Sequence, residues 1–166
     1  EDQQFNFAYE TFAANFISFS GSPIVFIEII SLPINGILFW NGSPLTAGAE
    51  VTVNNGLIEN LFYLPNANFN GNDSFKWNAS DPSFMALESA TLSIKINKVN
   101  DAPILSNIET QPILYSLGDS PVLVTQTTVI NDVDDNSIYS AKASITENFT
   151  RGDVLSLGIG VSPLII

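Results

Sequence analysis

The chain has 166 residues, of which 45% are hydrophobic and 13% charged, a composition that can bury a core and is unlike that of a disordered protein. Seventeen acidic residues against five basic ones give a formal charge of −12, which argues against nucleic-acid binding and against attraction to anionic membranes. Because the chain has neither Cys nor His, it has no disulfides and no zinc ligand set. Any metal would be held by oxygen atoms, so calcium is the natural candidate. The most apolar span, residues 24–40, is interrupted by Glu28, Pro33 and Asn35, and we expect no membrane insertion.

Alternation of apolar and polar residues predicts an antiparallel β protein. Short strands are predicted at residues 5–7, 24–30, 37–40, 50–53, 57–64, 73–79 and 91–96. Turn signals separate them, including Asn35-Gly36, Asn41-Gly42 and Asn54-Asn55-Gly56. Phe12 and Phe16 stand four residues apart and predict a single helical turn that closes one end of the core. Many short strands with frequent turns indicate an all-β sandwich, here of seven strands. A propeller is the weaker alternative, because no repeat of about 40 residues is present.

A domain boundary is predicted at residues 99–103, where the chain reads Val-Asn-Asp-Ala-Pro. Pro103 has no backbone donor and favours an extended Ala102, so neither sheet nor helix continues cleanly through it. The sequence therefore predicts a complete sandwich over 1–99, a linker over 100–103 and a second unit over 104–166.

The second unit is too short for a complete sandwich. Its 63 residues, counted from 104 to 166, fall short of the roughly 100 that an immunoglobulin-like sandwich needs. Extended segments are expected at 113–115, 122–129 and 141–145, and the last strands should be missing. The unpaired edge would be covered by residues 161–166 or by a second molecule, which would give self-association.

Several motifs together resemble a known class of repeat. They are the run YLPNANFNGNDSF at residues 63–75, Ser80-Asp81, and an alternating strand closed by Asn100-Asp101-Ala102-Pro103. In order and spacing these are similar to the cadherin-like tandem repeats of very large bacterial surface and secreted proteins, over about the first hundred residues. The resemblance implies a Greek-key, immunoglobulin/cadherin-like β-sandwich and an extracellular location. It also implies a structural or adhesive role, with neighbouring repeats of the same chain and a cell-surface protein or glycan as partners.

The resemblance further implies a calcium site at the joint between the two units. In cadherin repeats an Asn-Asp-Ala-Pro-type linker and an Asp-x-Asp loop hold the ion, and both patterns are present here. The matching positions are Asn100, Asp101, Asp132 and Asp134, with Asp135 as an alternative ligand and Asp73 as a further one that could lean toward the same hinge. The acidic residue that precedes Asn-Asp in the longer linker motif is absent, because Lys98-Val99 stands there. The alternative interpretation is a simple turn and a solvated acidic loop.

The opposite end of the first unit matches the pattern less well. Ser18-Phe19-Ser20 stands where a related repeat has Asp-x-Asp, which leaves Asp81, Glu1 and Asp2 as candidate ligands there. Solvated charge is the better interpretation of these three.

Catalysis has little support in the sequence. The usual base and thiol nucleophile are missing, and no glycine-rich loop precedes a Lys, so we expect no enzyme activity. The alternative function is that of a carbohydrate-binding accessory module of a secreted polysaccharide-degrading enzyme, with Phe19, Phe84 and Trp40 as candidates for stacking on sugars. Aromatic residues at strand spacing are, however, more often part of a core.

Overall fold

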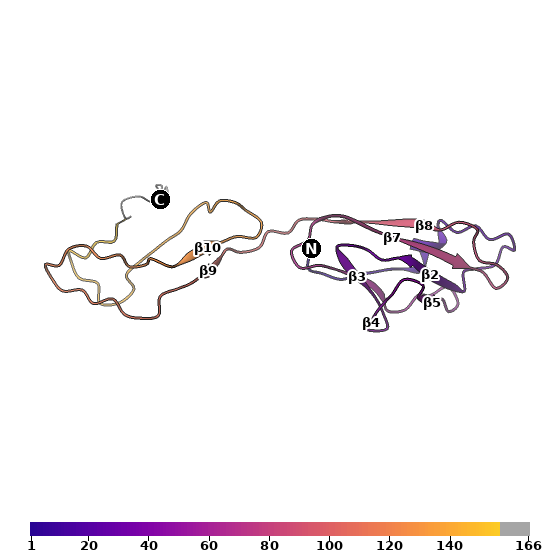
Figure 1. Ribbon diagram of the computed structural model, residues 1–166, viewed down its shortest axis with the longest axis horizontal. Coiled ribbons are helices and arrows are strands. Elements are labelled where there is room, and N and C mark those ends of the chain that lie inside the picture. Colours follow the sequence, from indigo (N-terminus) through magenta and orange to yellow (C-terminus); the bar gives the residue numbers. More distant parts are fainter. Residues whose placement is uncertain (157–166) are drawn as a thin grey trace. The chain divides into compact units, whose positions relative to one another are not determined.

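A computed structural model of the chain describes residues 1–156 (Figure 1). The contacts divide the chain into two units, Glu1–Val99 and a second that begins at Asn100, and each is described by itself. The first unit is a sandwich of two four-stranded antiparallel sheets, in the orders β1-β6-β3-β4 and β5-β2-β7-β8. The predicted all-β sandwich class is therefore confirmed.

The elements of the first unit follow the predicted pattern closely. The first sheet contains β1 (Phe5–Asn6), β6 (Leu61–Pro65), β3 (Gly36–Trp40) and β4 (Ser43–Pro44), and the second contains β5 (Glu50–Thr52), β2 (Phe26–Ser31), β7 (Gly71–Ser80) and β8 (Ala90–Ile96). Two hairpins, β3–β4 and β7–β8, join neighbours within a sheet, and every other connection within residues 1–99 passes to the opposite sheet. Such crossing connections are typical of Greek-key sandwiches.

Two turns explain where the prediction and the structure differ. Asn41 (φ 50°) and Gly42 (φ 79°) both adopt the left-handed conformation, and they form the two-residue turn of a hairpin that adds β4 to the seven predicted strands. Asn60 is also left-handed (φ 56°), which breaks the extended chain before Leu61. The strand predicted over residues 57–64 therefore begins only at Leu61.

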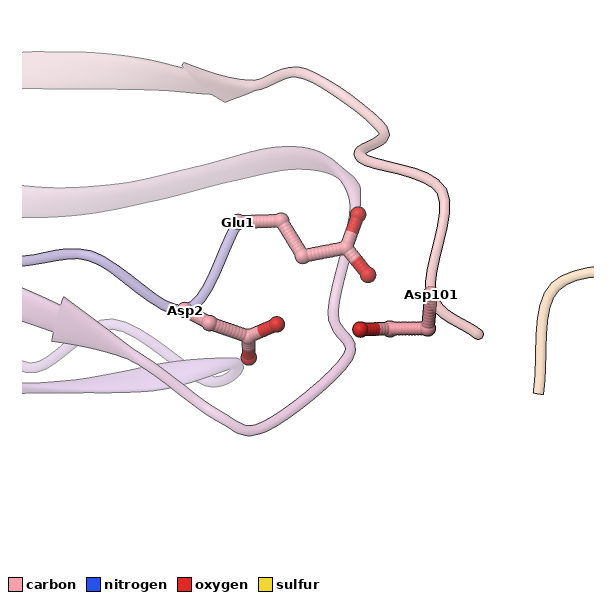
Figure 2. A group of neighbouring side chains, drawn as sticks. All are labelled: Glu1, Asp2 and Asp101. Atoms are coloured by element: carbon pink, nitrogen blue, oxygen red, sulfur yellow. The ribbon is translucent and has the colours of Figure 1, made fainter. Parts of the chain in front are cut away.

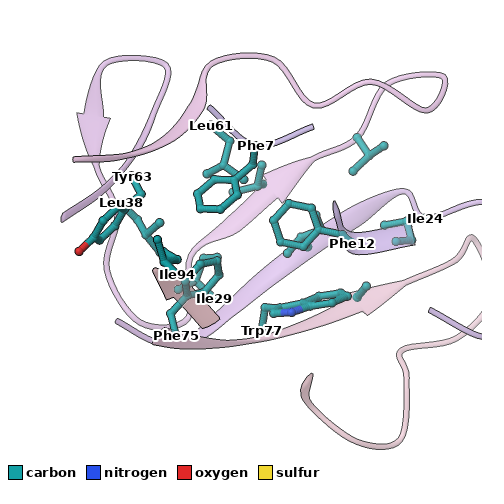
Figure 3. Close-up of a cluster of buried hydrophobic side chains, with 14 of the residues drawn as sticks. Phe7, Phe12, Ile24, Ile29, Leu38, Leu61, Tyr63, Phe75, Trp77 and Ile94 are labelled. Carbon is teal, nitrogen blue, oxygen red and sulfur yellow. The ribbon is translucent and has the colours of Figure 1, made fainter. Parts of the chain in front are cut away.

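The core lies between the two sheets and is built by alternation along β7 and β8. Asp73, Phe75 and Trp77 of β7 lie on the side of the strand that alternation over residues 73–79 assigns to the core, and all three are buried. The single-turn helix α1 (Tyr9–Ala13) inserts Phe12, which has no exposed surface, and its ring meets the Trp77 ring edge-on at a centroid distance of 5.0 Å. Figure 3 shows these rings with Phe7 in one cluster. The predicted helical turn is confirmed for Phe12, whereas Phe16 lies beyond the end of α1 and is only partly buried.

The second unit has much less regular structure. Its described residues contain one antiparallel pair, β9 (Ile104–Ser106) and β10 (Val129–Asn131), and no side chain among residues 100–156 is buried. The extended segments expected at 113–115 and 141–145, and most of the one at 122–129, are not strands here. Apolar alternation gives a strand only where a partner strand is in reach, and these segments have none among the described residues. The predicted covering segment, residues 161–166, lies outside the described residues.

Candidate metal site

The linker and the acidic loop of the second unit contact each other. The β9–β10 ladder pairs Ile104 with Asn131, so the residues just before β9 lie beside those just after β10. The Asp101 N–H donates a hydrogen bond of 2.6 Å to Asp134 Oδ2. Local strand pairing thus brings together two acidic segments that are about thirty residues apart in the sequence.

The acidic loop is ordered by its own first residue. Asp132 Oδ1 accepts hydrogen bonds from the N–H groups of Asp134 at 2.9 Å and Asp135 at 3.0 Å, an Asx-type turn. Asn100 Nδ2 donates to the Asp101 carbonyl oxygen at 2.8 Å and shapes the linker in the same way. Within residues 100–156, however, no three carboxylates lie within 4.8 Å of one another. The linker and the acidic loop are therefore in contact, but their carboxylates do not form a ready-made set of ligands around one point.

Glu1 and Asp2 lie at the end of the first unit from which the chain leaves. The Val99 N–H donates to Glu1 Oε2 at 2.8 Å, and the Asn68 N–H donates to Asp2 Oδ1 at 2.8 Å. Carboxylate oxygens of Glu1 and Asp2 lie within 4.8 Å of each other. Figure 2 shows both side chains.

The weaker alternative, a site shared by Glu1, Asp2 and Asp81, is wrong, and the preferred interpretation of solvated charge is wrong for Asp81, which is only 3% exposed. Gly71 pairs with Ile96 at the exit end of the sheet, whereas Asp81 follows the last residue of β7 at its other end. No sequence motif indicated the position of Glu1 and Asp2, because it depends on the pairing of β1 with β6, some sixty residues away.

Asp81 is held entirely by protein donors. The Ser18 and Ser20 hydroxyls donate to its Oδ2 at 2.6 and 2.8 Å, and the amides of Ser83 and Phe84 donate to its Oδ1, each at 2.8 Å. The Ser18 hydroxyl, followed by the Ser83 amide, holds the pKa of the Asp81 carboxyl well below its usual range. The Ser-x-Ser segment thus satisfies the Asp81 carboxylate with hydroxyl donors rather than with a cation.

Asp73 also has a structural environment. The residue is 7% exposed, and its carboxylate accepts hydrogen bonds from the Tyr63 hydroxyl at 2.8 Å and from the N–H groups of Ile34, Asn35 and Ser74 at 3.1, 2.9 and 2.8 Å. Burial raises the pKa of Asp73, but these four donors outweigh burial and hold it below its usual value. Burial, and then the hydrogen bond to Asp73, raise the pKa of Tyr63. These four hydrogen bonds stabilise the buried Asp73 carboxylate without a cation. Asp73 is therefore not a candidate ligand of the metal site.

Glu109 orders the second unit and was not singled out from the sequence. Its carboxylate accepts hydrogen bonds from the amides of Gln126 and Thr127 at 2.6 and 2.7 Å and from the hydroxyls of Thr125 and Thr128. The two amides are the main reason that the pKa of Glu109 lies well below its usual value. A separation of 16 to 19 residues carries no periodic signal that would have revealed these contacts.

Comparison of the chain with protein-family models, with curated proteins and with solved structures found no match. The resemblance to cadherin-like repeats therefore rests on the motifs alone. Among the described residues, no helix has the length and apolarity needed to cross a membrane.

Proposed function

We propose that this chain is a structural or adhesive repeat module of a long extracellular bacterial protein, and that calcium stiffens the joint between its two units. The hydrogen bond from the Asp101 amide to the Asp134 carboxylate carries the proposal. It ties the linker to an acidic loop, which is the arrangement that an ion at the joint needs. A tandem of two β units, a net charge of −12 and the absence of Cys and His agree with it.

The oxygen donors at the joint have the chemistry that calcium prefers. Calcium takes six to eight oxygen ligands, largely from carboxylates and carbonyls, at about 2.3–2.6 Å. The candidate donors in the second unit are Asn100, Asp101, Asp132, Asp134 and Asp135. A divalent cation would offset the mutual repulsion of these carboxylates and would draw their side chains closer together.

In the first unit, Glu1 fixes the chain just before the linker. Glu1 holds the amide of Val99, and Asp101 follows only two residues later in the chain. Covalent geometry alone limits the Val99–Asp101 Cα separation to about 7 Å, whatever the arrangement of the two units. An ion held by Asp101 and the acidic loop would restrict the linker two residues after the position that Glu1 fixes, and a restricted linker transmits force as a stiff spacer would.

Limited proteolysis with trypsin tests the proposal, because Lys98 places a cleavage site at the joint. Calcium should slow cleavage after Lys98, and the protection should be lost in Asp101→Asn and Asp134→Asn. Cleavage after Arg151 is the internal reference, since it lies away from the acidic loop in the sequence. Glu147→Gln is the matched control and should keep the protection. Protection that survives both aspartate substitutions would refute the proposed joint.

A further inference from the structure

The peptide bond between Asp81 and Pro82 has unusual chemistry for this chain. Of the nine prolines, only Pro82 follows an aspartate. The bond is a tertiary amide, and its nitrogen leaves readily once it has taken a proton. The Asp81 carboxylate is attached next to the carbonyl carbon of this bond, so its effective concentration there is high. An Asp–Pro bond is therefore more easily cleaved in acid than other peptide bonds.

A buried hydroxyl lies on the carbonyl group of this bond. The Ser80 hydroxyl donates to the main-chain carbonyl oxygen of Asp81 at 2.7 Å, and Ser80 is 6% exposed. The same hydroxyl lies 3.0 Å from the Phe84 carbonyl oxygen, so its proton is shared between two acceptors. A donor on a carbonyl oxygen stabilises the negative charge that develops there when the carbon is attacked.

The two oxygens of the Asp81 carboxylate have different partners. Oδ1 accepts the amides of Ser83 and Phe84, an Asx-type turn that directs the carboxylate toward the peptide joining Asp81 to the following proline. Oδ2 is held by the hydroxyls of Ser18 and Ser20, which are 63 and 61 residues earlier in the chain. Four charge-assisted hydrogen bonds fix the carboxylate and make it a weaker nucleophile.

We propose that the Asp81–Pro82 bond is a self-cleavage site, that Ser80 polarises its carbonyl group, and that Ser18 and Ser20 restrain the attacking carboxylate. In the reaction, the Asp81 carboxylate attacks its own main-chain carbonyl carbon. The bond from that carbon to the Pro82 nitrogen breaks, and the nitrogen takes a proton. Water then opens the resulting cyclic anhydride, which leaves both carboxyl groups of Asp81 free and gives Pro82 a free amine. The net change is hydrolysis of one peptide bond.

The proton for the leaving nitrogen comes from the solvent. The two segments that surround Asp81, residues 11–27 and 82–87, contain no charged side chain. The charged residues that flank these segments, apart from Asp81 itself, are all acidic: Glu10, Glu28 and Glu88. Cleavage should therefore be faster in acid, and its pH dependence should report Asp81 and the leaving nitrogen rather than a neighbouring base.

Cleavage would divide the first unit between β7 and β8. β8 would keep its backbone pairing with β7, which runs from Gly71–Ile96 to Trp77–Ala90, so β8 and the residues after it would stay attached by pairing alone. Under tension such a strand can be pulled out, which would make the bond a release point in a spacer. This consequence rests on the proposed function, whereas the cleavage itself does not.

Acid incubation of the complete chain followed by intact mass spectrometry tests the inference. At about pH 4, near the ordinary pKa of Asp, the products should be residues 1–81 and 82–166, with masses that sum to the parent mass plus one water. The double variant Ser18→Ala/Ser20→Ala should be cleaved at least about tenfold faster than the parent chain, because hydrogen bonds to a carboxylate are strong. Adding Ser80→Ala to it should slow cleavage about tenfold.

Controls separate the folded geometry from the intrinsic lability of the bond. Ser74→Ala, on the exposed side of β7, is the matched control and should leave the rate unchanged. In a denaturing concentration of urea at the same pH, all these variants should be cleaved at one rate. Circular dichroism at the incubation pH shows which variants are folded, and Ser20→Ala alone replaces the double variant if that one unfolds. Equal rates in the folded parent chain and the folded hydroxyl variants, no effect of Ser80→Ala, or no cleavage at Asp81–Pro82 in any folded form would each overturn the inference.

Discussion

Replacing Asp73 by Asn tests whether its hydrogen bonds hold the first unit together. The substitution keeps the size of the side chain but exchanges one acceptor oxygen for an NH2 group. Each carboxylate oxygen accepts two donors: Oδ1 accepts the amides of Ile34 and Ser74, and Oδ2 accepts the Asn35 amide and the Tyr63 hydroxyl. Whichever way the Asn amide is turned, its NH2 must face two donors.

The loss of stability in Asp73→Asn can be estimated from the hydrogen bonds that Asp73 accepts. Hydrogen bonds to a charged group contribute roughly 1.5–3 kcal/mol each, and the Tyr63 hydroxyl can retain its contact of 3.1 Å with the Asn35 carbonyl oxygen. We therefore expect Asp73→Asn to lower the free energy of unfolding by about 3 kcal/mol. Urea denaturation followed by tryptophan fluorescence measures this, because Trp40 and Trp77 both lie in the first unit.

A matched control and a double-mutant cycle sharpen the test. Glu50 is an exposed carboxylate on β5, and Glu50→Gln should cost less than about 0.5 kcal/mol. Combining Asp73→Asn with Tyr63→Phe should reveal a coupling energy of about 1 kcal/mol or more, since the two side chains share a hydrogen bond. A loss below about 1 kcal/mol for Asp73→Asn, or strictly additive effects, would show that these hydrogen bonds do not stabilise the first unit.

Two further predictions concern the same unit. A Cβ at Gly36 would overlap the Tyr63 ring, so Gly36→Ala should lower the free energy of unfolding by about 2–3 kcal/mol in the same denaturation assay. Gly42→Ala, where φ is 79° but the surrounding space is open, should cost only about 1 kcal/mol, and equal costs would contradict the close packing. The folded-state pKa of Asp81 lies below its unfolded value of about 3.9. The contribution of Asp81 to stability is therefore fully present above about pH 4, and it is lost as the pH falls through the folded-state pKa. Asp81→Asn should therefore make the denaturation midpoint less dependent on pH below about pH 4, and an unchanged pH profile would count against the Ser18–Asp81 contact.

The β-sandwich could be predicted because the positions of its strands, and the side of each strand that faces the core, follow from short local patterns in the sequence. Period-two alternation fixes which side of β7 faces the core, and it correctly predicted burial for Phe75 and Trp77. The same pattern placed Asp73 inside, but it could not show that the donors to this carboxylate would come from Ile34 and Asn35, nearly forty residues away. Alternation identifies a buried position and does not identify its hydrogen-bond partners.

The candidate site could be predicted only in part, for a related reason. The contact between the linker and the acidic loop follows from one short strand pair, in which Asn131 pairs with Ile104 just after Pro103. The position of Glu1 depends on strand pairing between segments far apart in the first unit, and such pairing cannot be inferred from a short sequence motif. In the second unit, the apolar alternation at residues 113–115 and 141–145 was a poor guide, because strand pairing needs partners that the described residues do not supply.

If oxygen atoms of the linker and of the acidic loop share a calcium ion, the chain should bind calcium in solution. Isothermal titration of the complete chain with calcium measures this binding most directly, with Asp134→Asn as the test variant and Asp119→Asn as a control from the same unit. Binding should be saturable with a Kd of about 10⁻⁴–10⁻³ M, as in extracellular modules, and should be lost in Asp134→Asn and kept in Asp119→Asn. Absence of saturable heat up to roughly 10 mM calcium, or the same binding isotherm in Asp134→Asn, would contradict the account.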